Sequence, residues 1–208
     1  MRHGRRRVTW QGTALVVGAV TAGCALVTAL PQDEGLDDPI VVEGAVGETL
    51  DLDYAVLTVT DVRVADTVAG VAETALAGGT FVVVDVTWRA TQQATTFAGA
   101  EISDTRGRRY WPAALGDCAG SASAEPGYAW RATYCFDVPQ EALAGATVRL
   151  ARGSQSEDHA EQRRDAVAVV DLGITAGEAP ALWEAAETVT PEPQGFATPA
   201  ATAEGGEG

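Results

Sequence analysis

The chain contains 208 residues and carries a formal net charge of −15, from 29 acidic and 14 basic residues. All of the basic residues are arginine, and the sequence has neither lysine nor asparagine. Nucleic-acid binding depends on a basic surface, so this charge balance excludes a nucleic-acid-binding module. The length is sufficient for one ordinary domain with extensions at its ends.

The N-terminal region has the pattern of a membrane anchor. Four arginines lie within residues 1–9, and residues 10–30 contain no charged side chain. A helix of about 20 apolar residues spans the hydrocarbon core of a bilayer. Acidic residues follow from Asp33 onward, so the charges obey the positive-inside rule. We therefore expect a cytoplasmic tip at residues 1–9 and a transmembrane signal anchor at residues 10–30. The protein would then be a single-pass cell-membrane protein with its N-terminus in the cytoplasm and its C-terminal domain outside.

Two processing sites in this region leave alternatives open. Small residues precede a possible cleavage site after Ala29. The segment Thr21–Cys24 resembles a bacterial lipobox, which would make Cys24 a site of lipidation. The apolar run continues past both sites as far as Leu30, and this favours a retained anchor.

The rest of the chain divides by composition into three parts. Residues 31–39 are acidic and contain Gly and Pro, which is typical of a stalk. Residues 40–174 have the size of one domain. Residues 175–208 are rich in Ala, Glu, Pro, Thr and Gly and contain no basic residue, so they are predicted to form a disordered acidic tail. A short helix over 180–189, with Pro180 at its first position, is the alternative for part of this tail.

The domain has the alternating pattern of β-strands. Val82, Val84, Val86 and Trp88 fall on one face of a predicted strand, and the pattern in 55–64 changes phase as it would at a β-bulge. The predicted strands are 48–53, 55–64, 81–90, 102–104, 109–111, 130–138, 147–151 and 166–172. The Ala-rich segment 69–79 is predicted to be a loop. Seven or eight short strands predict an all-β, immunoglobulin-like β-sandwich, preceded by one transmembrane helix.

The two cysteines of this domain are expected to be linked. Cys118 and Cys135 are 17 positions apart, and both would lie outside the cell, where paired cysteines normally form a disulfide. Cys135 alternates with Tyr134 and Phe136, so it points away from the core. The bridge would therefore fasten the loop 113–127 to the surface of the sheet.

No pattern of residues indicates a catalytic or metal site. The acidic segment Glu157–Glu161 contains His159 but lacks the spacing of an established metal site, and we expect no metal or cofactor. Aromatic residues offer a possible binding surface instead. Tyr110, Trp111 and Tyr128 lie at predicted strand ends or in loops, where ordinary packing at the sheet edge is the favoured interpretation. The alternative is that they serve as a stacking platform or as interface anchors.

Four short segments occur in an order that resembles a known family. They are Gly47–Thr49, Phe81–Thr87, Asp104–Tyr110 and Phe136–Pro139. This order is similar to that of a family of bacterial extracellular immunoglobulin-like domains of unknown function, membrane-anchored or secreted and of actinobacterial type. The chain departs from the family pattern after Thr87 and in the longer insert 113–127. The resemblance implies an exported immunoglobulin-like sandwich and brings no catalytic residues.

These features together predict a non-catalytic extracytoplasmic interaction module rather than an enzyme. It would bind another envelope or membrane protein through a loop face or a sheet edge. The alternative is a cell-wall glycan-binding domain that uses the region of Tyr110, Trp111 and Tyr128. An exported hydrolase is a distant third possibility.

Overall fold

The computed structural model describes residues 38–70, 73–118, 123–153, 162 and 164–197. The chain divides into two units at the boundary between Asp38 and Pro39, and the second unit is the one described below. No helix in the described ranges is long and apolar enough to cross a membrane. The expected anchor at residues 10–30 and most of the expected stalk lie outside those ranges and remain predictions.

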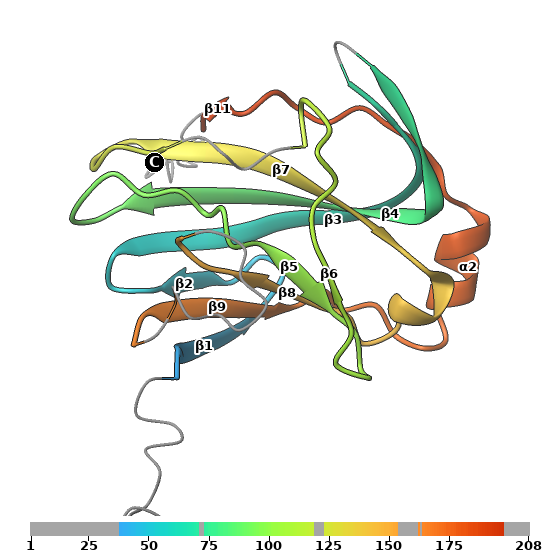
Figure 1. Cartoon of the computed structure of the whole chain (residues 1–208), viewed down its shortest axis with the longest axis horizontal. Coiled ribbons are helices and arrows are strands. Elements are labelled where there is room, and N and C mark those ends of the chain that lie inside the picture. Colours follow the sequence, from blue (N-terminus) through green and yellow to red (C-terminus); the bar gives the residue numbers. More distant parts are fainter. Residues whose placement is uncertain (1–37, 71–72, 119–122, 154–161, 163, 198–208) are drawn as a thin grey trace, which may run out of the picture. The chain divides into compact units, whose positions relative to one another are not determined.

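The second unit is a β-sandwich of two sheets (Figure 1). Its strands are β1 (Ile40–Ala45), β2 (Thr49–Asp51), β3 (Ala55–Ala69), β4 (Thr74–Ala90), β5 (Glu101–Ser103), β6 (Arg109–Tyr110), β7 (Ala129–Val138), β8 (Thr147–Leu150), β9 (Ala166–Asp171), β10 (Glu187–Val189) and β11 (Gly195–Phe196). Two short helices accompany them, η1 (Gln140–Ala142) and α2 (Ala179–Glu184). All eight strands predicted from the sequence are present.

The strand order is that of a Greek-key sandwich. One sheet has the order β1-β9-β8-β5-β6, and the other has the order β10-β3-β4-β7-β11 with β2 also paired to β3. From β4 onward the chain changes sheets between β4 and β5, between β6 and β7, between β7 and β8 and between β9 and β10. The orders β3-β4-β7 and β9-β8-β5-β6 are those of strands A-B-E and G-F-C-C′ in an immunoglobulin sandwich.

The core lies between the two sheets and follows the alternating pattern of the strands. Val82, Val84, Val86 and Trp88 of β4 are all buried in it, as the sequence pattern predicts. The register between β3 and β4 shifts between Val59 and Asp61, which confirms the predicted bulge. The bulge returns the apolar side chains of β3 to the core after the change of phase.

A tight turn at Asp104–Gly107 joins β5 to β6, and the N–H of Gly107 donates to the carbonyl of Asp104 at 2.9 Å. Gly107 has a φ of +75°, which glycine adopts without strain. One carboxylate oxygen of Asp104 accepts hydrogen bonds from the backbone N–H groups of Arg106 and Arg108, both at 2.9 Å. The other oxygen accepts a hydrogen bond from Nε of Arg108 at 2.6 Å. Burial acts to raise the pKa of Asp104, but these three donors outweigh it and hold the pKa below its usual value.

The prediction of a loop at 69–79 is wrong, because residues 69 and 74–79 belong to the paired strands β3 and β4. Ala69 of β3 pairs with Thr74 of β4, so the two strands continue well beyond the predicted ends. Asp137 of β7 stabilises this extension, because its two carboxylate oxygens accept hydrogen bonds from the N–H groups of Gly78 and Gly79 at 2.8 and 2.9 Å. Glycine is required at position 79, since a Cβ there would lie 2.2 Å from the backbone oxygen of Val138.

The described part of the predicted disordered tail, residues 175–197, is ordered. Thr175 and Glu178 bond to each other ahead of α2, with their Oγ1 and Oε2 atoms 2.6 Å apart. The strand β10 pairs with β3, and β11 pairs with β7. Pairing with existing strands supplies the backbone hydrogen bonds that the segment could not form alone. Residues 198–208 lie outside the described ranges.

Candidate functional site

The disulfide covers one end of the outer face of the β3-β4-β7 sheet. Cys118 and Cys135 are bonded, with Cα atoms 5.3 Å apart, and both are fully buried. Phe81 and Val83 lie in the same buried cluster, and Leu115 packs against it. The bridge therefore fastens the loop to the outer surface of the sheet, as expected, and covers apolar side chains that would otherwise face solvent.

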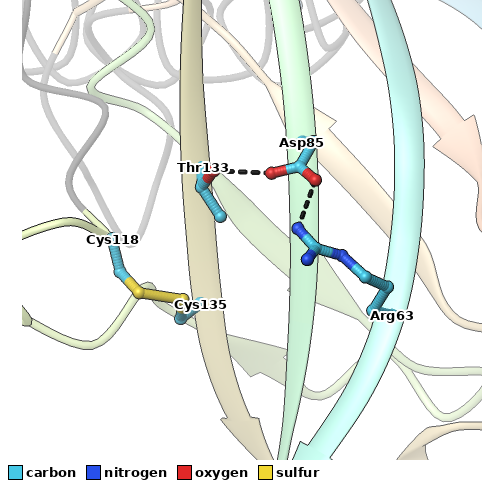
Figure 2. Close-up of a disulfide and its surroundings, with 5 residues drawn as sticks. All are labelled: Arg63, Asp85, Cys118, Thr133 and Cys135. Carbon is cyan, nitrogen blue, oxygen red and sulfur yellow. Dashed lines mark hydrogen bonds and ion pairs between the residues drawn. A yellow bond between two sulfur atoms is a disulfide. The ribbon is translucent and has the colours of Figure 1, made fainter. Parts of the chain in front are cut away.

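A polar cluster lies beside the disulfide on the same face (Figure 2). One carboxylate oxygen of Asp85 accepts a hydrogen bond from the hydroxyl of Thr133, and the other pairs with the guanidinium of Arg63. Nε of Arg63 also lies 3.1 Å from a carboxylate oxygen of Asp61. Both oxygens of Asp85 are thus engaged, which makes this residue a structural link between β3, β4 and β7.

The C-terminal segment crosses this outer face as a strap, defined here as residues 187–197. Its two ends pair with opposite sides of the three central strands, since β10 lies beside β3. At the other end, β11 lies beside β7 (Figure 1). Between them, Glu192 forms an ion pair with Arg131 of β7. A cavity of about 210 Å³ is lined by this pair together with Asp85, Thr87 and Thr133.

The end of the strap completes an exposed aromatic cluster, defined as Tyr128, Trp130 and Phe196. Phe196 pairs in register with Trp130, with ring centroids 4.9 Å apart, and the Tyr128 ring is 5.8 Å from that of Phe196. Tyr128 is 60% exposed and Phe196 is 65% exposed, whereas Trp130 is half-buried against the core. Backbone pairing holds the cluster in place, because Ala197 N–H also donates to the carbonyl of Ala129 at 2.9 Å.

The structure does not bring the three predicted surface aromatics together. Tyr110 turns inward and packs against the core, and its burial raises the pKa of its hydroxyl. Trp111 is 39% exposed, and its ring lies 6.0 Å from the guanidinium carbon of Arg109. Pro112, the next residue, pairs with Phe136 near the end of β7, whereas Tyr128 precedes the start of that strand. Extended chain rises about 3.3 Å per residue, so Tyr128 and Phe136, eight residues apart, are separated by roughly 26 Å.

Phe196 is the member of the cluster that sequence reasoning missed. It lies in a segment whose composition resembles that of a disordered tail, and only the pairing of Phe196 with Trp130 reveals its place. The acidic, Pro-containing tail 175–208 has two aromatic residues, Trp183 and Phe196, and an aromatic residue in such a tail was the one available signal.

The structure describes only some of the other residues that were predicted to form sites. The Cys118–Cys135 disulfide is present. Cys24 and the segment Glu157–Glu161 lie outside the described ranges. Within those ranges, no group of three or more His, Cys, Asp or Glu side chains is arranged to hold a metal ion.

Comparisons with known proteins give only a distant structural likeness. No model of a known protein family matches the chain, and no curated protein sequence matches it. The yjhA protein of Bacillus subtilis has 15% identity and a TM-score of 0.47, over 62% of this chain and 99% of that one. The secreted protein MPT63 of Mycobacterium tuberculosis has 18% identity and a TM-score of 0.44, over 64% and 99%.

An uncharacterised β-sandwich protein of Clostridium difficile gives a similar result. It has 15% identity and a TM-score of 0.41, over 65% of this chain and 96% of that protein. At these identities and TM-scores the likeness assigns neither a family nor a function, and the assignment of the fold rests on the strand order of this chain.

Proposed function

We propose that this protein is a non-catalytic interaction module on the outside of the cell, held at the membrane by residues 10–30. Its partner is another envelope or membrane protein. The observation that carries the proposal is the exposed aromatic cluster of Tyr128, Trp130 and Phe196. Tyr and Trp are enriched among the residues that dominate the energy of protein interfaces.

The cluster has the physical properties of an interface anchor. Tyr128 and Phe196 leave large apolar surfaces in water, and covering them in a complex is favourable by about 25 cal/mol per Å². The pairing of β11 with β7 already holds Phe196 in one position. Binding therefore loses little conformational entropy at this residue.

The charge of the chain indicates the chemistry of the partner surface. The net charge is −15, and Glu125, whose carbonyl accepts a hydrogen bond from the N–H of Tyr128 at 3.3 Å, is exposed beside the cluster. Complementary charges speed association and exclude wrong partners. The partner is therefore expected to present an apolar pocket with a basic rim.

The disulfide supports a position outside the cytoplasm. Cys118 and Cys135 are bonded and buried. Disulfides form and persist in oxidising compartments and are rare in the cytosol. This agrees with the charge pattern of residues 1–30, which predicts export of everything after the anchor.

Glycan binding is the weaker alternative. The Tyr128 and Phe196 ring planes are 59° apart, so they form no flat surface on which a sugar ring would stack. Trp111 lies near the opposite end of β7 from Tyr128 and adds nothing to the same surface. Two tilted rings fit into a shaped pocket on a protein partner, whereas a planar ligand such as a sugar ring needs a flat surface.

Site-specific photo-crosslinking in intact membranes tests the proposal. A photoreactive phenylalanine replaces Phe196 in the full chain, and the matched control replaces Leu76, which is 79% exposed on the β3–β4 hairpin. We expect one dominant membrane-protein adduct at position 196, absent at position 76 and lost in Tyr128→Ala. Equal labelling at the two positions would contradict the proposal, and adducts with cell-wall material alone would favour the glycan alternative.

A further inference from the structure

The strand β1 forms an open edge of its sheet. It pairs in parallel with β9 from Ile40 to Ala45, and no strand in the described ranges pairs with its other side. Ile40 is 61% exposed and Val41 is 50% exposed. The other outermost strands of the two sheets, β6, β10 and β11, are only two or three residues long.

The hydrogen bonds of β1 define which of its backbone groups are open. Ile40 N–H donates to the carbonyl of Asp165 at 2.8 Å, so Ile40 faces β9. Residues alternate in this respect along a strand, and the N–H and C=O groups of Val41 and Glu43 therefore point away from β9. Ala45 also points away, but its N–H and C=O are both bonded to Glu48, at 3.1 and 3.0 Å.

This open stretch lacks most of the features that protect edge strands. Natural edges are usually shortened, bulged or interrupted by Pro or inward-pointing charges. Within β1 the one charged side chain is Glu43, and the register with β9 is regular over all six residues. Two exposed β-branched residues at its start make it a template for another strand.

We propose that β1 pairs with β1 of a second copy of this chain, antiparallel and about a two-fold axis at Val42. Val41 of each copy then exchanges backbone hydrogen bonds with Glu43 of the other, so the open groups of both edges are satisfied. The Ala45–Glu48 turn blocks extension of the pairing beyond this stretch. An isologous two-fold contact is the commonest form of protein dimer.

Charge favours this antiparallel arrangement. Ile40 of one copy lies opposite Gly44 of the other. Parallel pairing would instead place Glu43 beside Glu43, and like charges on adjacent strands are destabilising.

The acidity of the chain predicts how the dimer responds to salt. Each copy carries a net charge of −15, so the copies repel one another at low ionic strength. Salt screens this repulsion, with a Debye length of about 8 Å at physiological ionic strength. Dimerisation is therefore expected to strengthen as salt is added.

Disulfide trapping in the full chain tests the pairing. Val42→Cys is introduced in a Cys24→Ser background, with Leu76→Cys as the control for an exposed site on another surface. Opposed residues of a non-hydrogen-bonded pair have Cα atoms about 4.5 Å apart, within disulfide range. We expect a covalent dimer from Val42→Cys that increases with salt. Yields no higher than those of Leu76→Cys, or linkage to a different protein, would overturn the proposal.

A proline variant supplies an independent test. The N–H of Val41 points away from β9, so Val41→Pro keeps the β1–β9 hydrogen bonds and blocks pairing with a second copy. In sedimentation of the full chain in detergent, we expect the dimer to dissociate about tenfold or more readily, at an unchanged melting temperature. A monomeric wild type, or a Val41→Pro protein that dimerises as the wild type does, would refute the inference.

Discussion

Removal of the Cys118–Cys135 disulfide should lower the free energy of unfolding by about 3 kcal/mol. The bridge links residues 17 positions apart. The chain-entropy relation for a loop of this length gives about 3 kcal/mol at 25 °C, because the bridge restricts the unfolded chain. For a domain of this size, a loss of about 3 kcal/mol lowers the melting temperature by about 6–12 °C.

The double variant Cys118→Ala with Cys135→Ala is the appropriate test. Alanine keeps the buried cluster around Phe81 and Val83 apolar, so the change reports mainly on the cross-link. Cys24→Ala is the matched control, since that residue belongs to the predicted anchor and should leave the melting temperature unchanged. Circular dichroism during heating measures both variants. A decrease of less than about 2 °C in the double variant would refute the loop-entropy reasoning.

Thiol titration provides a second, independent readout. The sequence has three cysteines, so the denatured, unreduced wild type should show no more than one reactive thiol, that of Cys24. After reduction, the two bridged cysteines become reactive as well. Three reactive thiols before reduction would show that the bridge is absent in the isolated protein.

Three further changes test other parts of the fold. Gly79→Ala should destabilise the β3–β4 hairpin by about 1–3 kcal/mol in urea unfolding, because its Cβ would overlap the backbone of Val138; a neutral effect would contradict this close approach. Asp104→Asn should lower the free energy of unfolding by about 2 kcal/mol at pH 7. Because the wild-type carboxylate has a lowered pKa, the wild type loses the stability from this group as the pH falls below about 4, and the variant should lose less over that range. Tyr54 is buried just ahead of β3, and its hydroxyl donates a hydrogen bond to the carbonyl of Ala166 at 2.9 Å. Burial raises the pKa of Tyr54 to about 12, so its hydroxyl stabilises the fold below about pH 10 and that contribution is lost as the pH rises toward 12. Alkaline unfolding of Tyr54→Phe should therefore be shallower than that of the wild type over this range.

The strands that were predicted correctly share one physical feature. In β4 and β7, one face packs into the core between the sheets, so apolar residues recur at every second position. Core burial also explains why the bulge near Asp61 was visible in the sequence, since the apolar pattern must change phase where the extra residue is inserted.

Elements without a one-sided pattern were missed. In β1, Val42 and Gly44 are only partly buried and the other residues are exposed, and the sequence IVVEGA does not alternate between apolar and polar residues. The hairpin at 69–79 consists largely of Ala and Gly, whose small side chains give a weak signal in any periodicity. Its order comes from the carboxylate of Asp137, which lies 59 residues from Gly78 in sequence and cannot be paired with it by inspection of the local sequence.

The strap shows why composition alone misjudges a terminal segment. Its acidic, Pro-containing sequence buries too little apolar surface to order itself, and that reasoning holds for an isolated peptide. Here β10 and β11 need only a few residues each, because β3 and β7 already present open backbone groups. Two prolines in the crossing segment lower the entropy of the unfolded chain, which makes ordering less costly. The edges of the sandwich therefore determine the path of the segment, and this places Phe196 beside Tyr128 and Trp130 as a surface that neither part of the chain forms alone.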